Sequence, residues 1–154
     1  MTKVNQIYLA AVIWGIISSI ISVIMVEDHS LGVPTVLTIV MDVVAALIIL
    51  LAGRRGKRQG ARPAGVGIIT GLLYGVVSGW PTLLVHLTRA EFIRTLRTHH
   101  LPVTNVGPAL QFANSVGTHL AQWAGAAIVG LLLGLILGTI GGVITRNPAS
   151  AMDV

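Results

Sequence analysis

The sequence contains no cysteine among its 154 residues. A chain without cysteine has no disulfide bonds, no thiolate ligands for zinc or iron–sulfur clusters, and no cysteine nucleophile. The absence leaves open whether the protein faces an oxidising or a reducing compartment. It also removes one of the two side chains that most often hold transition metals, so that any such site would depend on histidine.

Charged residues are also scarce. Asp, Glu, Lys and Arg together make up 10% of the chain, whereas hydrophobic residues make up 54% and the mean hydropathy is +0.86. An ordinary soluble domain has about 25% charged residues. The composition therefore excludes an ordinary soluble domain and indicates a membrane protein.

The common catalytic motifs are missing as well. There is no Walker A loop, no H-E-x-x-H motif and no dinucleotide-binding fingerprint. Ser78 lacks the glycine two positions earlier that a rhomboid-like protease motif would supply, because Val76 stands there. A single carboxylate in the apolar segments, Asp42, offers no acid–base pair. We expect no enzyme, no catalytic residue and no cofactor.

The hydrophobic residues fall into four runs. These runs cover residues 6–26, 33–52, 64–87 and 121–144. Each has roughly the 20 residues that a helix needs to cross a hydrocarbon core of about 30 Å. Helices are expected because the hydrocarbon core contains no water to form hydrogen bonds with backbone N–H and C=O groups, and a helix pairs these groups within the segment. The alternation of apolar and polar residues that is typical of barrel strands is absent. The first run is too long for a signal-peptide core, so we expect it to stay in the mature protein.

These runs predict an all-α, polytopic membrane protein. We expect residues 1–154 to form a single membrane domain in which four transmembrane helices pack as a bundle. The connecting segments are then a cytoplasmic basic loop at 53–63 and an outer loop at 88–120.

The orientation follows from the basic residues. Five of the ten Lys and Arg residues lie in the loop at 53–63, namely Arg54, Arg55, Lys57, Arg58 and Arg62. Cytoplasmic loops carry an excess of Lys and Arg, so this loop and both termini are expected in the cytoplasm. Arg89, Arg94 and Arg97 argue mildly the other way. By default the membrane is a cell (inner) membrane, and we expect the basic loop to meet lipid headgroups rather than nucleic acid.

The outer loop has a pattern of its own. Phe92, Ile93 and Leu96 recur at helical spacing opposite the arginines of 88–99, which predicts a short amphipathic helix on the membrane surface. A helix running from Pro108 to 144 would be about 55 Å long, so a break near Gly117 is expected. Residues 109–116 then form either a surface helix or a shallow re-entrant segment.

Two rows of glycines are the clearest pattern in the sequence. The third run has Gly67, Gly71, Gly75 and Gly79, and the fourth has Gly130, Gly134, Gly138 and Gly142. Residues four apart share one face of a helix, and small residues let helix backbones approach closely in lipid. Such glycine-zipper rows predict helix packing, either inside one bundle or between protomers. A glycine-lined pore or lipid groove is a further alternative.

Asp42 is the candidate functional residue, because it lies midway along the second run. Ionised acids are costly at that depth, so the stripe of Thr35, Thr38, Asp42 and Ala45 is expected to face the bundle interior. Thr38, Ser18, Ser19 and Tyr74 are the expected neighbours of Asp42. The acid then either holds two helices in register as a neutral group or binds a proton or cation on a transport path.

Five histidines, at positions 29, 86, 99, 100 and 119, all fall on the predicted outer side. They show none of the usual ligand spacings, such as H-x-x-x-H, so no metal site is expected from the sequence. A metal- or haem-binding role for these outer-face histidines is a third alternative.

The first functional hypothesis is a non-enzymatic integral membrane protein that acts through helix–helix association. It would work in the lipid bilayer as a homo-oligomer or as a small subunit of a membrane complex. The alternative is a small channel or proton-coupled transporter centred on Asp42.

Overall fold

The computed structural model describes residues 3–27, 35–84 and 86–145, and every regular element in these ranges is a helix. The elements are α1 (Lys3–Glu27), α2 (Thr35–Arg58), α3 (Pro63–Gly79), the 3-10 turn η1 (Trp80–Leu83), α4 (Arg89–Thr98), α5 (Val106–Ala113) and α6 (Val116–Ile144).

Four of these helices are long and apolar enough to cross a membrane. They are α1, α2, α3 with its extension η1, and α6. Their outward faces carry large exposed hydrophobic side chains such as Ile20, Val36 and Val143. Exposed apolar surface of this extent is unusual for a soluble monomer and suits contact with lipid. The prediction of an all-helical chain with four apolar helices is confirmed.

The predicted boundaries need several corrections. α2 continues to Arg58, so that four of the five basic residues of the predicted loop are helical and the connection shrinks to residues 59–62. Cationic side chains near a helix C-terminus interact favourably with the helix dipole, so Arg55, Lys57 and Arg58 stabilise the last turn of α2. Gly60, with a φ of +73°, makes the turn, and Pro63 starts α3 at a position where its missing N–H is not needed.

The C-terminal end of α3 and the N-terminal end of α6 also differ from the predicted runs. α3 ends at Gly79 rather than at residue 87, because the Trp80–Pro81 step changes to a 3-10 turn. α6 begins five residues before position 121. The expected break lies at Asn114 and Ser115 rather than at Gly117, since the Ser115 side chain accepts a hydrogen bond from the Thr118 N–H at 3.3 Å and caps α6.

The amphipathic segment predicted within residues 88–99 is a helix, α4. Its N-terminus carries a capping box, in which the Thr88 N–H donates to Glu91 Oε2 at 2.6 Å and the Glu91 N–H donates to Thr88 Oγ1 at 3.3 Å. Phe92, Ile93 and Leu96 are half-buried, whereas the three arginines of the helix are exposed. The predicted separation of apolar and basic faces is therefore present.

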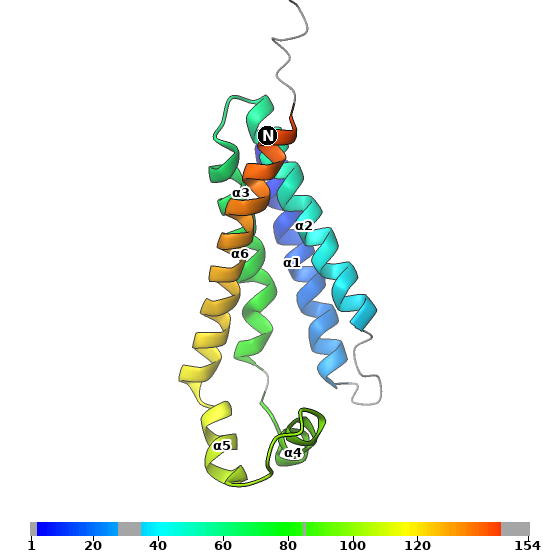
Figure 1. Ribbon diagram of the computed structural model, residues 1–154, viewed down its shortest axis with the longest axis vertical. Coiled ribbons are helices and arrows are strands. Elements are labelled where there is room, and N and C mark those ends of the chain that lie inside the picture. Colours follow the sequence, from blue (N-terminus) through cyan, green and yellow to red (C-terminus); the bar gives the residue numbers. More distant parts are fainter. Residues whose placement is uncertain (1–2, 28–34, 85, 146–154) are drawn as a thin grey trace, which may run out of the picture.

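The four long helices lie side by side. In Figure 1, α3 and α6 run together along most of their length, while α2 diverges from them toward the end where α4 and α5 lie. Side-chain hydrogen bonds connect neighbouring long helices. Trp14 Nε1 donates to Met41 O at 3.2 Å, Ser19 Oγ to Val77 O at 2.7 Å, and Trp123 Nε1 to Val76 O at 3.0 Å. Polar side chains thus join α1 to α2 and α3, and α6 to α3.

Candidate functional site

The two glycine rows face each other within one chain. A Cβ added at Gly71 would collide with the Gly130 carbonyl oxygen, and one added at Gly134 would collide with that of Gly67. Gly138 similarly leaves only 2.7 Å between such a Cβ and Gly67 Cα. The backbones of α3 and α6 are therefore in direct contact, and these glycine surfaces are used inside the chain.

The ends of the rows have different partners. Gly75 and Gly79 both oppose Ala126 of α6, with the Ala126 Cβ 2.8 Å from a Cβ added at Gly79. Gly142 lies against the ring of Pro63, whose Cβ and Cγ would both be 2.5 Å from an added Cβ. Ala126 extends the α6 row by one further step of four residues, a signal that a search for small residues rather than glycine alone would have found.

Two glycines outside the rows bring α2 against α6. A Cβ at Gly53 would collide with the Gly138 carbonyl oxygen, and one at Gly141 would collide with that of Leu50. Gly53 was assigned to the cytoplasmic loop in the sequence analysis, so its packing role was missed. Both contacts lie toward the C-terminal ends of α2 and α6, from which the two helices diverge (Figure 1).

A groove of about 660 Å³ lies between α2, α3 and α6. Small residues from all three helices form much of its lining, namely Ala45, Ala46, Gly75, Ala126 and Gly130. Ile49, Leu133 and Leu137 line it toward the C-terminal ends of α2 and α6, and Asp42, Tyr74 and Ser78 contribute the polar atoms. The groove is thus mainly apolar, with one polar region formed by Asp42, Tyr74 and Ser78.

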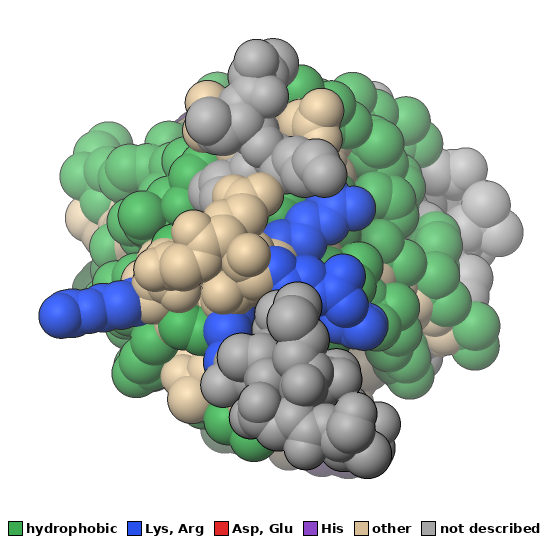
Figure 2. All heavy atoms as spheres, turned by 90° about the horizontal axis from the view of Figure 1, so that it is seen from above, with side chains coloured by type: hydrophobic (Ala, Val, Ile, Leu, Met, Phe, Trp, Pro, Cys, Tyr) green, Lys and Arg blue, Asp and Glu red, His purple; other side chains and the backbone are tan. Residues whose placement is uncertain are grey.

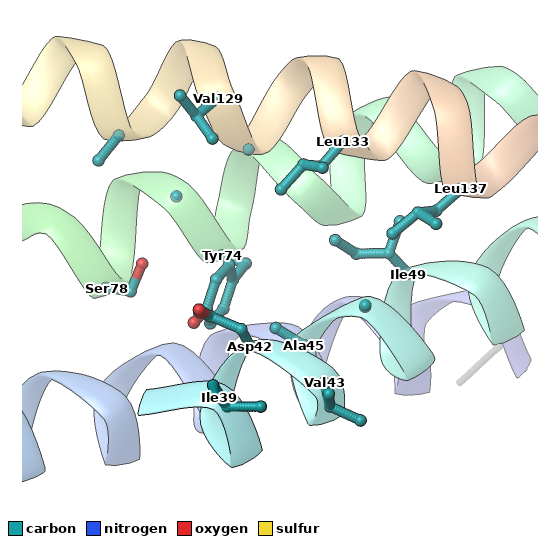
Figure 3. A pocket seen from close by; sticks show the side chains of 14 residues that line it. Ile39, Asp42, Val43, Ala45, Ile49, Tyr74, Ser78, Val129, Leu133 and Leu137 are labelled. Carbon is teal, nitrogen blue, oxygen red and sulfur yellow. The ribbon is translucent and has the colours of Figure 1, made fainter. Parts of the chain in front are cut away.

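Asp42 is exposed at this groove. In Figure 3 the Asp42 carboxylate and the Tyr74 side chain point toward one another across the groove, from α2 and α3. Tyr74 lies near the middle of the candidate span Pro63–Leu83, and Ser78 follows it one turn later on the same helix. A carboxyl and two hydroxyls therefore share one cavity near the middle of the apolar zone.

The predicted neighbourhood of Asp42 is found in part. Ala45 is buried, but Thr38 and Asp42 are exposed, so the stripe does not face the interior along its whole length. The reason is the divergence of α2 from α3 and α6 toward the N-terminus of α2 (Figure 1), which opens the groove beside Asp42. Tyr74 joins Asp42 as expected.

The two predicted serines do not reach the groove. Ser19 Oγ donates to backbone oxygens of Gly15, at 2.8 Å, and of Val77. Ser18 is buried, and its hydroxyl has no hydrogen-bond partner among the described residues. Ser78 was considered only as a nucleophile, although its spacing of four residues from Tyr74 places both side chains on one face of α3.

The basic residues gather at one end of the molecule. Figure 2, seen from that end, shows Lys and Arg side chains clustered over the C-terminus of α2 and the connection to α3. Arg55 and Arg58 line a pocket of about 430 Å³ together with Gln6 and Gln59. This surface is suited to contact with anionic groups.

The chain matches no protein-family model, no curated protein and no solved structure.

Proposed function

We propose that this chain is a non-enzymatic integral membrane protein that works as one component of a membrane assembly. A transmembrane helix, from a second copy of the chain or from another subunit, occupies the groove between α2, α3 and α6. The observation that carries the proposal is the exposure of Asp42 in a lateral groove lined with small residues.

The first support is the free-energy cost of exposing Asp42 to lipid. An acid facing lipid near the centre of a membrane helix costs about 2.5–3.5 kcal/mol on insertion scales. A helix seated in the groove would remove the carboxyl from lipid and could offer it a hydrogen-bond donor. Such interhelical hydrogen bonds contribute about 0.6–2 kcal/mol each.

The second support is the shape of the groove. Ala45, Ala46 and Gly130 leave room for another helix backbone to approach, as small residues do at helix contacts in lipid. The two glycine rows are already occupied by each other within the chain. Association with a further helix would therefore use the groove rather than the rows.

The membrane arrangement is part of the proposal. The four apolar helices form one transmembrane bundle with both termini and the basic end in the cytoplasm, where Arg54, Arg55, Lys57, Arg58 and Arg62 meet anionic headgroups. α4 lies on the outer membrane surface with Phe92, Ile93 and Leu96 toward the lipid, because its two faces differ so strongly in polarity.

The experiment that tests the assembly is native mass spectrometry of the purified chain released from detergent. We expect a discrete complex, either an integral multiple of 16.1 kDa or one chain plus a second membrane polypeptide. A monomer alone, at a concentration where the protein is folded, would contradict the proposal.

A second candidate function is proton-coupled transport of a small solute or ion. The grouping of Asp42, Tyr74 and Ser78 in one cavity favours it, because an ionisable residue at this depth with hydroxyl neighbours can take up and release a proton. In this candidate function, Asp42 is the proton carrier and the groove is part of the solute path.

Asp42→Asn separates the two functions. The amide keeps hydrogen-bonding capacity but cannot exchange a proton, so transport should fall to the background rate while an assembly should persist. The measurement is solute or proton flux in liposomes, paired with native mass spectrometry of the same sample. Ser78→Ala is the matched control in the same groove, for which we expect residual flux. Normal flux in Asp42→Asn liposomes would exclude a proton-carrying role for Asp42.

A further inference from the structure

His119 is a buried histidine without a hydrogen-bond partner. It lies in the first turns of α6, its side chain is only 7% exposed, and neither ring nitrogen has a partner among the described residues. Buried polar groups are nearly always paired, so an unpartnered imidazole calls for an explanation by an ion, a water molecule or a ligand. The residue takes no part in the groove described above.

A second imidazole lies next to it. The ring centroids of His86 and His119 are 5.4 Å apart, with an angle of 43° between the ring planes. The residues between them, 87–118, include α4 and α5, so no spacing in the sequence indicates this pair. The tertiary structure alone brings the two rings together.

Asn114 holds the segment of His86 in place. The Leu87 N–H donates to Asn114 Oδ1 and Asn114 Nδ2 donates to Leu87 O, both at 2.9 Å. Asn114 directly precedes Ser115, the cap of α6, and the His119 N–H donates to Ser115 O at 3.1 Å. Two short hydrogen-bonded segments thus position both histidines relative to the start of α6.

The tautomer of His86 is set by its backbone contact. His86 Nδ1 lies 3.2 Å from Leu84 O, and because a carbonyl oxygen can only accept, Nδ1 is the donor. The lone pair of the neutral ring is then on Nε2. A histidine that ligates a metal commonly donates its other ring N–H to a backbone carbonyl in this way.

We propose that His86 and His119 form a two-histidine site for a divalent transition-metal ion of the Zn²⁺, Ni²⁺ or Cu²⁺ class. With metal–nitrogen distances of about 2.0–2.1 Å and a tetrahedral angle, two imidazole centroids on one ion come about 5 Å apart. The observed separation agrees with this geometry. Imidazole suits these ions better than Mg²⁺ or Ca²⁺, which prefer oxygen ligands.

A cavity of about 290 Å³ beside His119 leaves space for the remaining ligands. Gln122, Thr82 and Ser22 line it, and the two hydroxyls donate to carbonyls of their own segments, which leaves their lone pairs available. No third His, Cys, Asp or Glu of the described residues joins the pair. The site is therefore open, and it loads and releases an ion rather than holding it as a closed structural centre.

The test uses the full-length, untagged chain in detergent, stripped with a chelator and titrated with Cu²⁺ or Zn²⁺. We expect one ion to bind per chain, with Cu²⁺ giving an electron paramagnetic resonance signal split by two imidazole nitrogens. His86→Gln and His119→Gln should each weaken binding at least tenfold. His99→Gln and His100→Gln, at exposed histidines near the end of α4, are the matched controls and should leave affinity unchanged.

Asn114→Ala tests the positioning of the pair. It should weaken binding about 10- to 100-fold, as changes to outer-shell partners do, while keeping the two-nitrogen signal. The proposal fails if the wild-type chain binds no ion, or if binding survives unchanged in both His86→Gln and His119→Gln. His86 is exposed, so its variant keeps the test valid even if His119→Gln does not fold. These outcomes are independent of any partner helix in the groove.

Discussion

Gly134→Leu should separate α3 from α6 and unfold the protein at a far lower temperature than the wild type. A Cβ at this position collides with the Gly67 carbonyl oxygen and lies 2.9 Å from Ile68 Cα. Main-chain atoms cannot rotate away as a side chain can, so α3 itself must move. We expect a loss well beyond the about 1–3 kcal/mol of an ordinary overpacked site, measured by thermal unfolding in detergent followed by circular dichroism.

Gly125 supplies the matched control on the same helix. A Cβ added there would have no atom within 4 Å apart from its chain neighbours and the nearby backbone of α6, so Gly125→Leu should leave the packing intact. Gly125→Ala should even stabilise α6, by up to about 1 kcal/mol, because alanine is the better helix former. Equal destabilisation by Gly134→Leu and Gly125→Leu would show that α3 and α6 are not in backbone contact.

Ala46→Trp should abolish the proposed assembly while leaving the chain folded. Ala46 lines the groove on α2, and an indole there would occupy space that the partner helix needs. The groove, with a volume of about 660 Å³, can receive the ring without displacing α3 or α6. Native mass spectrometry should then show the monomer alone, with the melting temperature of the isolated chain close to that of the wild type.

Leu47→Trp is the control for this variant. Leu47 is the next residue on α2, is 52% exposed and does not line the groove. It faces lipid in the proposed arrangement, where tryptophan is tolerated, so the complex should persist. An intact complex in the Ala46→Trp variant, with the same mass as the wild-type complex, would show that the groove is not the contact surface.

Several features of the fold could be predicted from the sequence because lipid restricts the backbone structures that a membrane-spanning segment can adopt. A run of about 20 apolar residues has to satisfy its own backbone hydrogen bonds, and a helix does so within the segment. The number and approximate positions of the four long helices follow from this rule. The amphipathic α4 follows in the same way from the 3.6-residue period of Phe92, Ile93 and Leu96.

Boundaries were less accurate where tertiary contacts decide them. The basic segment was predicted as a loop because charges end an apolar run, yet α2 continues through it to Arg58. Gly53 in that segment packs against Gly138 of α6, a contact between residues 85 positions apart. Hydropathy measures the length of an apolar run and contains no information about such a neighbour.

Composition and periodicity were enough to predict the helical class, the apolar spans and the two glycine faces. The surfaces that meet are defined by helix packing: the glycine rows face each other, Asp42 opens into a lateral groove, and His86 lies beside His119. The physical reason is that periodicity defines a face on one helix, whereas the partner of that face depends on how all helices are rotated and tilted together.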